Sequence, residues 1–116
     1  MSDVRTTPHA EISGAVAHLY KSRTGRGPTT ITTLLTSGLV VCVIEDSTTP
    51  FEGTLMQLGA AEVVNEARRT FQRAVGPQLV EEVERILGRT VRGHVPTYDA
   101  AVDAGTDLFL LEAVPA

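Results

Sequence analysis

The chain has 116 residues, a hydrophobic content of 42% and a net charge of −4, which together suit one globular domain with a single core. The acidic balance argues against nucleic-acid binding through phosphate contacts. The longest apolar run, Leu39–Ile44, is six residues long, far short of the ~20 that a membrane helix needs, so we expect no direct membrane insertion.

The first residues, Met1–Thr7, lack the apolar stretch of a secretory signal, and we expect them to be disordered. The only cysteine, Cys42, rules out an internal disulfide and lies in an apolar run, where it is expected to be a small buried side chain. Both features are typical of a cytoplasmic protein.

The first predicted helix begins at Thr7-Pro8, an N-cap residue followed by proline, and ends at Gly25. Its predicted buried face consists of residues at three- and four-residue spacing: Ile12, Ala15, Val16, Leu19 and Tyr20. Two strands follow, at about residues 29–34 and 39–45, with Thr36–Gly38 as the hairpin turn. The first is rich in threonine and suits a sheet edge, whereas the second is apolar on both faces and suits the centre.

A capping box, Thr49-Pro50-Phe51-Glu52, predicts the start of a helical region that reaches Leu87. Gly59 interrupts it, and Gly76-Pro77 predicts a kink or a break with restart. Gly88 closes the region. Six side chains are expected to face inward before the Gly76-Pro77 interruption: Leu55, Leu58, Val63, Ala67, Phe71 and Val75.

Two further strands are predicted at about residues 90–96 and 107–113, with residues 97–106 as a solvated loop. The order helix, Gly-Arg, strand, strand thus occurs twice. The predicted fold is α+β, a pseudo-repeated α-β-β-α-β-β chain with a four-stranded, mainly antiparallel sheet and helices packed on one face. The two apolar strands would meet in the centre, so the uncovered face would be apolar; we expect a second copy to cover it, giving a homodimer.

The turn after the first predicted helix, which we call the Arg26 turn, is the main candidate site. Its glycines free backbone N–H groups and its basic side chains could hold an anion, or it could be only a helix C-cap in which Arg26 pairs with a carboxylate such as Asp46. The candidate anion- or partner-binding residues are Lys21, Arg23, Gly25, Arg26, Gly27 and Thr29.

Other polar groups suggest no reaction. Glu52 is explained by its capping role, and Arg68, Arg69 and Arg73 are expected to form surface ion pairs with Glu62 and Glu66. Asp99, Asp103 and Asp107 are assigned to the solvated loop. The three histidines, His9, His18 and His94, are scattered without metal-ligand spacing, so we expect no metal, no cofactor and no catalytic set.

Several short strings resemble the MpsC-like family, small bacterial domains named after an accessory component of a sodium-translocating, membrane-potential-generating system. The strings that carry the resemblance are Leu19-Tyr20-Lys21, Thr24-Gly25-Arg26-Gly27-Pro28-Thr29, Asp46 with Thr49-Pro50-Phe51-Glu52 and Leu55, Arg68-Arg69 with Phe71, Val83-Glu84, Gly88-Arg89 and Phe109-Leu110-Leu111-Glu112. The resemblance implies a cytoplasmic protein linked to ion or bicarbonate uptake, and it supplies no catalytic residues.

The sequence therefore predicts one domain over residues 1–116 that is not an enzyme. It would be an accessory or regulatory protein that binds a protein partner, for which a membrane transport system is one candidate, and it would bind no nucleic acid. The alternative is a domain that senses a small anion (phosphate, a carboxylate or bicarbonate) through the Arg26 turn.

Overall fold

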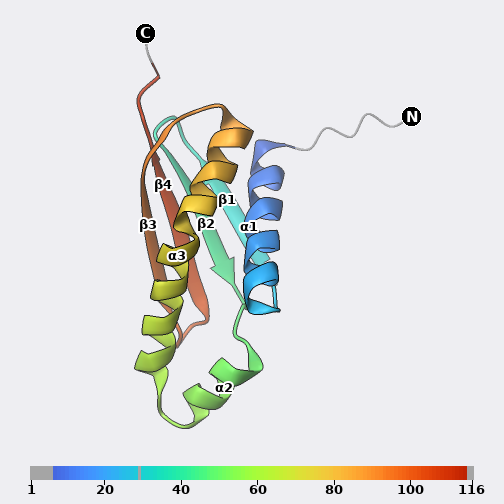
Figure 1. Ribbon diagram of the computed structural model, residues 1–116, viewed down its shortest axis with the longest axis vertical. Coiled ribbons are helices and arrows are strands. Elements are labelled where there is room, and N and C mark those ends of the chain that lie inside the picture. Colours follow the sequence, from blue (N-terminus) through green and yellow to red (C-terminus); the bar gives the residue numbers. More distant parts are fainter. Residues whose placement is uncertain (1–6, 29, 115–116) are drawn as a thin grey trace, which may run out of the picture.

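The structure, a computed structural model, describes residues 7–28 and 30–114. They form α1 (Pro8–Thr24), β1 (Thr30–Leu35), β2 (Leu39–Glu45), α2 (Pro50–Gln57), α3 (Ala61–Leu87), β3 (Val91–Asp99) and β4 (Ala104–Leu111). The strands make one antiparallel sheet in the order β1-β2-β4-β3, and α1 and α3 cover one of its faces (Figure 1). The α+β fold with the two apolar strands in the centre is thus confirmed.

The local signals at the helix ends are confirmed. Thr7 caps α1 by accepting a hydrogen bond from the Ala10 N–H at 3.2 Å. The expected disorder of the first residues concerns residues 1–6, which lie outside the described residues. Gly25 and Gly88 end α1 and α3 at φ angles of 82° and 65°, a left-handed conformation that favours glycine. Thr49 and Glu52 form the predicted capping box.

Of the two alternatives predicted at Gly76-Pro77, a kink or a break with restart, the break is wrong, because α3 is one helix from Ala61 to Leu87. Pro77 removes one helical hydrogen bond, at a cost of about 3 kcal/mol. Val75, Leu79 and Val83, on either side of it, are buried against the same sheet, and each contributes about 1.5–3 kcal/mol. Burial of one continuous face therefore outweighs the proline.

The predicted long loop at residues 97–106 is also wrong, because β3 extends to Asp99 and β4 begins at Ala104. Thr97 and Thr106 pair across the two strands, and their hydroxyl oxygens lie 2.6 Å apart. The turn between the strands needs only a few residues because Asp103 adopts a positive φ of 47°.

Part of the expected inward face of the second helical region is wrong. The break at Gly59 changes the phase of the following helix, so that Val63 and Ala67 are exposed and Val64 is buried instead. Leu58, which caps the end of α2, is also exposed. The polar residues Arg68 and Gln72 occupy the next inward positions. The main core consists of apolar side chains from α1, α3, β2 and β4: Ile12, Val16, Tyr20, Val40, Cys42, Ile44, Val75, Leu79, Val83, Phe109 and Leu111.

Cys42 is fully buried, as predicted, and burial raises the pKa of its thiol to about 11. No helix in the described part of the chain is both long and apolar enough to cross a membrane.

Candidate functional site

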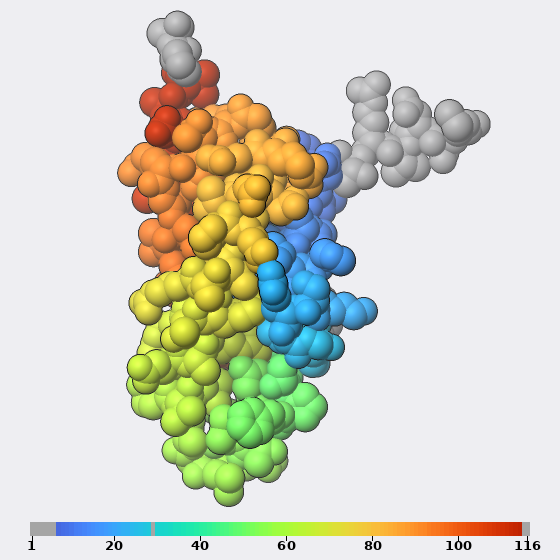
Figure 2. Space-filling view, in the orientation of Figure 1, coloured from blue at the N-terminus to red at the C-terminus, as the bar shows by residue number. Residues whose placement is uncertain are grey.

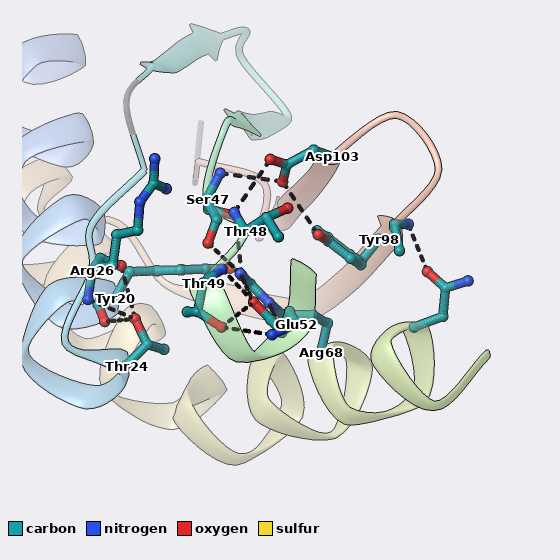
Figure 3. Close-up of polar contacts among 12 residues, drawn as sticks. Tyr20, Thr24, Arg26, Ser47, Thr48, Thr49, Glu52, Arg68, Tyr98 and Asp103 are labelled. Carbon is teal, nitrogen blue, oxygen red and sulfur yellow. Dashed lines mark hydrogen bonds and ion pairs between the residues drawn. The ribbon is translucent and has the colours of Figure 1, made fainter. Parts of the chain in front are cut away.

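The Arg26 turn is occupied by contacts within the protein. The Arg26 guanidinium donates to the Asp46 main-chain carbonyl at 2.8 Å and to its carboxylate at 3.3 Å. The Arg26 N–H donates to the Thr24 hydroxyl, which closes the end of α1 (Figure 3). Arg26 thus pairs with the predicted carboxylate, in the way expected of a structural cap.

The other candidates of this turn point in different directions. Arg23 donates to the Gln78 side chain on α3 at 3.1 Å and lines the groove between α1 and α3, away from Arg26. Gly27 packs near the stem of Lys21. Thr29 lies outside the described residues. The structure therefore does not bring these groups into one cavity, and anion binding here stays a prediction.

A denser polar cluster surrounds Arg68, which is 4% exposed. From α3, its guanidinium donates to both carboxylate oxygens of Glu52, to the Ser47 hydroxyl at 3.1 Å and to the Ser47 carbonyl (Figure 3). Its Cζ atom lies 5.0 Å from the centre of the Tyr98 ring. The expected surface ion pairs of Arg68 with Glu62 and Glu66 are therefore wrong.

Glu52 links this cluster to the start of α2. Its carboxylate accepts from the Thr49 N–H and hydroxyl, completing the capping box, and also accepts from Arg68. Burial alone would raise the pKa of Glu52, but the hydrogen bonds from Arg68 and Thr49 outweigh it and hold the pKa below its usual value. Glu52 is thus ionised and has two structural roles.

Asp103 fixes the segment before α2 from the opposite side. Its carboxylate accepts from the backbone N–H groups of Ser47 and Thr48, each at 3.2 Å, and from the Tyr98 hydroxyl at 3.3 Å. Burial would raise the pKa of Asp103, and these hydrogen bonds, with one from the Thr48 side chain, lower it overall. We call Arg68, Glu52, Ser47, Asp103 and Tyr98 the arginine anchor.

The helix that this anchor holds has no buried residue. Phe51 is 72% exposed, Leu58 is 75% exposed and Val63, in the first turn of α3, is 57% exposed. These three residues, which we call the apolar tip, lie on α2 and the start of α3 at one end of the molecule (Figures 1 and 2). Only Leu55 and Met56 of α2 pack inward, against Val64, Tyr98 and Ala100.

A second buried cluster lies between α1, α3 and the sheet. Asp107 is fully buried in β4; it accepts from the Tyr20 hydroxyl at 2.7 Å, and its other oxygen lies 2.7 Å from His94 Nε2. Its assignment to a solvated loop is therefore wrong. Burial, followed by the charge of Asp107, raises the pKa of Tyr20. The His94 ring stacks on Phe109 and closely approaches Gly76, which has no side chain to obstruct it.

The sequence analysis missed Arg68, Gln72 and Asp107 because polar residues at inward positions look like surface residues in a pattern of apolar spacing. One signal was available: Arg68 lies four residues after Val64, in phase with the buried positions Val75, Leu79 and Val83. Recognising it requires knowing that the helix restarts after Gly59.

Residues 5–111 match the family described as "Na+-translocating membrane potential-generating system (MpsC)". No curated protein and no solved structure matches the chain.

Proposed function

The chain belongs to the MpsC family, and from that premise we propose that it is a non-enzymatic accessory protein that binds a protein subunit of an ion-translocating membrane system from the cytoplasmic side. The family description supplies the link to such a system. The apolar tip supplies the surface for binding.

The observation that carries this proposal is the exposure of Phe51, Leu58 and Val63 at one end of the domain. Phe51 and Leu58 are seven positions apart, two helical turns, so they share one face of α2 or its immediate continuation. Large aromatic side chains such as Phe51 are enriched at protein–protein interfaces relative to the rest of the surface. An exposed apolar cluster of this kind favours a docking role.

The charges around the tip favour a protein partner over a lipid surface. Residues 50–67 contain no Lys or Arg, whereas Glu62 and Glu66 are exposed. Attraction to anionic lipid headgroups depends on clustered basic residues, which this segment lacks. The expected partner therefore presents an apolar patch bordered by basic residues.

The arginine anchor would prepare the tip for binding. An eight-residue helix is marginal in water by itself, and no residue of α2 is fully buried. The capping box and the contacts of Arg68 hold α2 in one orientation before a partner arrives. A surface that is already ordered loses less conformational entropy on binding.

Affinity purification tests this proposal. Tagged protein is mixed with detergent-solubilised membranes of the encoding organism, and retained proteins are identified by mass spectrometry. We expect an integral subunit of an ion-translocating system to be retained, and the Phe51→Ala/Leu58→Ala variant to retain at least tenfold less, since truncating hot-spot residues typically costs 2 kcal/mol or more each.

The matched control is Val102→Ala, which truncates a side chain that is 68% exposed in the turn between β3 and β4. This variant should retain the subunit as wild type does. A second experiment measures flotation of the purified protein with neutral and anionic lipid vesicles that contain no membrane protein. Binding to these vesicles that is lost in the Phe51→Ala/Leu58→Ala variant would contradict the proposal, as would equal retention of the subunit by this variant and wild type.

A further inference from the structure

Within residues 7–28 and 30–114, no helix lies over one face of the sheet, and we call this face the open face. In the two central strands every second residue is buried beneath the helices, and the residues between them point to the open face. The half-buried residues on this face are Leu39, Val41 and Val43 in β2, and Ala104, Thr106, Leu108 and Leu110 in β4. The view in Figure 1 shows α1 and α3 together on the other side of the sheet.

The strand register arranges these residues into rows across the sheet. Leu34, Val41, Leu108 and Val95 are aligned neighbours on β1, β2, β4 and β3, and they form an apolar row that spans all four strands. Leu34 is 54% exposed and Val95 is 47% exposed, so the row is open to solvent at both edges. Leu39 and Leu110 extend it on one side.

On the other side the rows become polar. The next row is Thr32, Val43, Thr106 and Thr97, and the last is Thr30, Glu45, Ala104 and Asp99, which we call the acidic row. At the opposite end of the sheet Arg92 is exposed in a β-bulge between Val91 and Gly93. The open face therefore carries carboxylates at one end and apolar side chains along the rest, and the exposed Arg92 lies at the opposite end of the sheet.

We propose that the open face binds the same face of a second copy of this chain, with the two-fold axis running along the apolar row, across the strands. Each side chain of the apolar row would then meet its own counterpart. This surface is separate from the apolar tip, so the inference stands independently of the proposed function.

The charge distribution selects this axis. A two-fold axis along the strands would superpose the two acidic rows and bring four carboxylates together in an apolar interface, which is unfavourable. An axis along the apolar row places the acidic rows at opposite ends of the dimer, each towards the end of its partner that carries Arg92. The surface is thus complementary to itself in one orientation only.

The size of the patch indicates a reversible dimer. Four strands about 4.8 Å apart and three rows about 6.8 Å apart cover ~400 Å² per copy in projection. Stable interfaces bury about 800 Å² of accessible surface per partner, so a patch of this size falls below that class and belongs with the weak, transient interfaces. We expect a dissociation constant in the micromolar range.

Sedimentation or light scattering of the full chain from about 1 to 200 μM tests the inference. We expect the mass to rise from monomer to dimer, and the Leu34→Glu/Val95→Glu variant to remain monomeric across the range. Both substituted positions are exposed edge-strand sites, so the variant should fold. Val102→Glu adds a charge at an exposed apolar site away from the sheet, and it should dimerise as wild type does.

Cysteine cross-linking tests the axis, since the native Cys42 is buried. Facing sheets lie about 10 Å apart, too far for a direct disulfide, so the test uses a short bis-maleimide cross-linker. With the axis along the apolar row, Leu34→Cys alone should be cross-linked into a dimer and Thr30→Cys should not. With an axis along the strands, Leu34 would instead face Val95 of the other copy, and only the Leu34→Cys/Val95→Cys double variant would cross-link. A monomer at every concentration, or a dimer unaffected by the two glutamates, would overturn the inference.

Discussion

Arg68→Ala tests whether the arginine anchor holds α2 in place. The substitution removes a guanidinium that makes four hydrogen bonds to Glu52 and Ser47, and it leaves the Glu52 carboxylate, whose side chain is only 14% exposed, without its cation. Breaking a buried pair by removing one partner costs about 3–5 kcal/mol. Because Glu52 keeps its bonds to Thr49, we expect the lower end of that range, about 3 kcal/mol.

Urea unfolding followed by circular dichroism measures this loss, and thermal unfolding should show a Tm lower by roughly 12 °C for a domain of this size. Arg73→Ala is the matched control: it removes an exposed arginine from the same helix and should change stability by less than about 0.5 kcal/mol. In a double-mutant cycle, Arg68→Ala and Glu52→Ala should couple by about 1–3 kcal/mol. A loss below 1 kcal/mol for Arg68→Ala, with no coupling, would refute the reasoning.

Two further predictions concern pH and packing. The folded state lowers the pKa of Glu52, so the stability that this carboxylate contributes is complete above the ordinary glutamate pKa of about 4.3 and is lost as the pH falls below that value. The advantage of wild type over Glu52→Gln in urea unfolding should therefore shrink on acidification. A difference in stability that does not change with pH would contradict this. Gly76→Ala would place a Cβ atom 2.8 Å from His94 Nδ1, so we expect the free energy of unfolding to fall by about 1–2 kcal/mol despite the better helix propensity of alanine. In Gly14→Ala the new Cβ atom would have nothing within 4 Å, so the free energy of unfolding should rise by up to about 1 kcal/mol. Equal Tm shifts for the two variants would show that His94 does not pack as described.

The fold was predictable because its signals are local. Gly25, Gly88 and the capping box at Thr49 each act through backbone geometry or a hydrogen bond within four residues, and the structure contains all three. The apolar strands β2 and β4 were recognisable as central because no polar residue divides Leu39–Ile44 or Leu108–Leu111.

The candidate site was mostly unpredictable because it depends on contacts between distant segments. Arg68 meets Glu52 sixteen positions away and Ser47 twenty-one positions away, and neither partner is implied by the sequence around Arg68. Asp107 is buried only because Tyr20 and His94 come from other elements to bind it. The exposure of Val63 follows from the helix break at Gly59, which was predicted without its effect on the phase of the following helix.

The central claim is that the apolar tip is the docking surface. Its most direct test is hydrogen–deuterium exchange on the purified complex of this protein with the membrane subunit. We expect slower exchange at residues 50–63 on binding and unchanged exchange in the Arg26 turn. Protection of the Arg26 turn with none in α2 would contradict docking through the apolar tip and would place the docking surface at that turn.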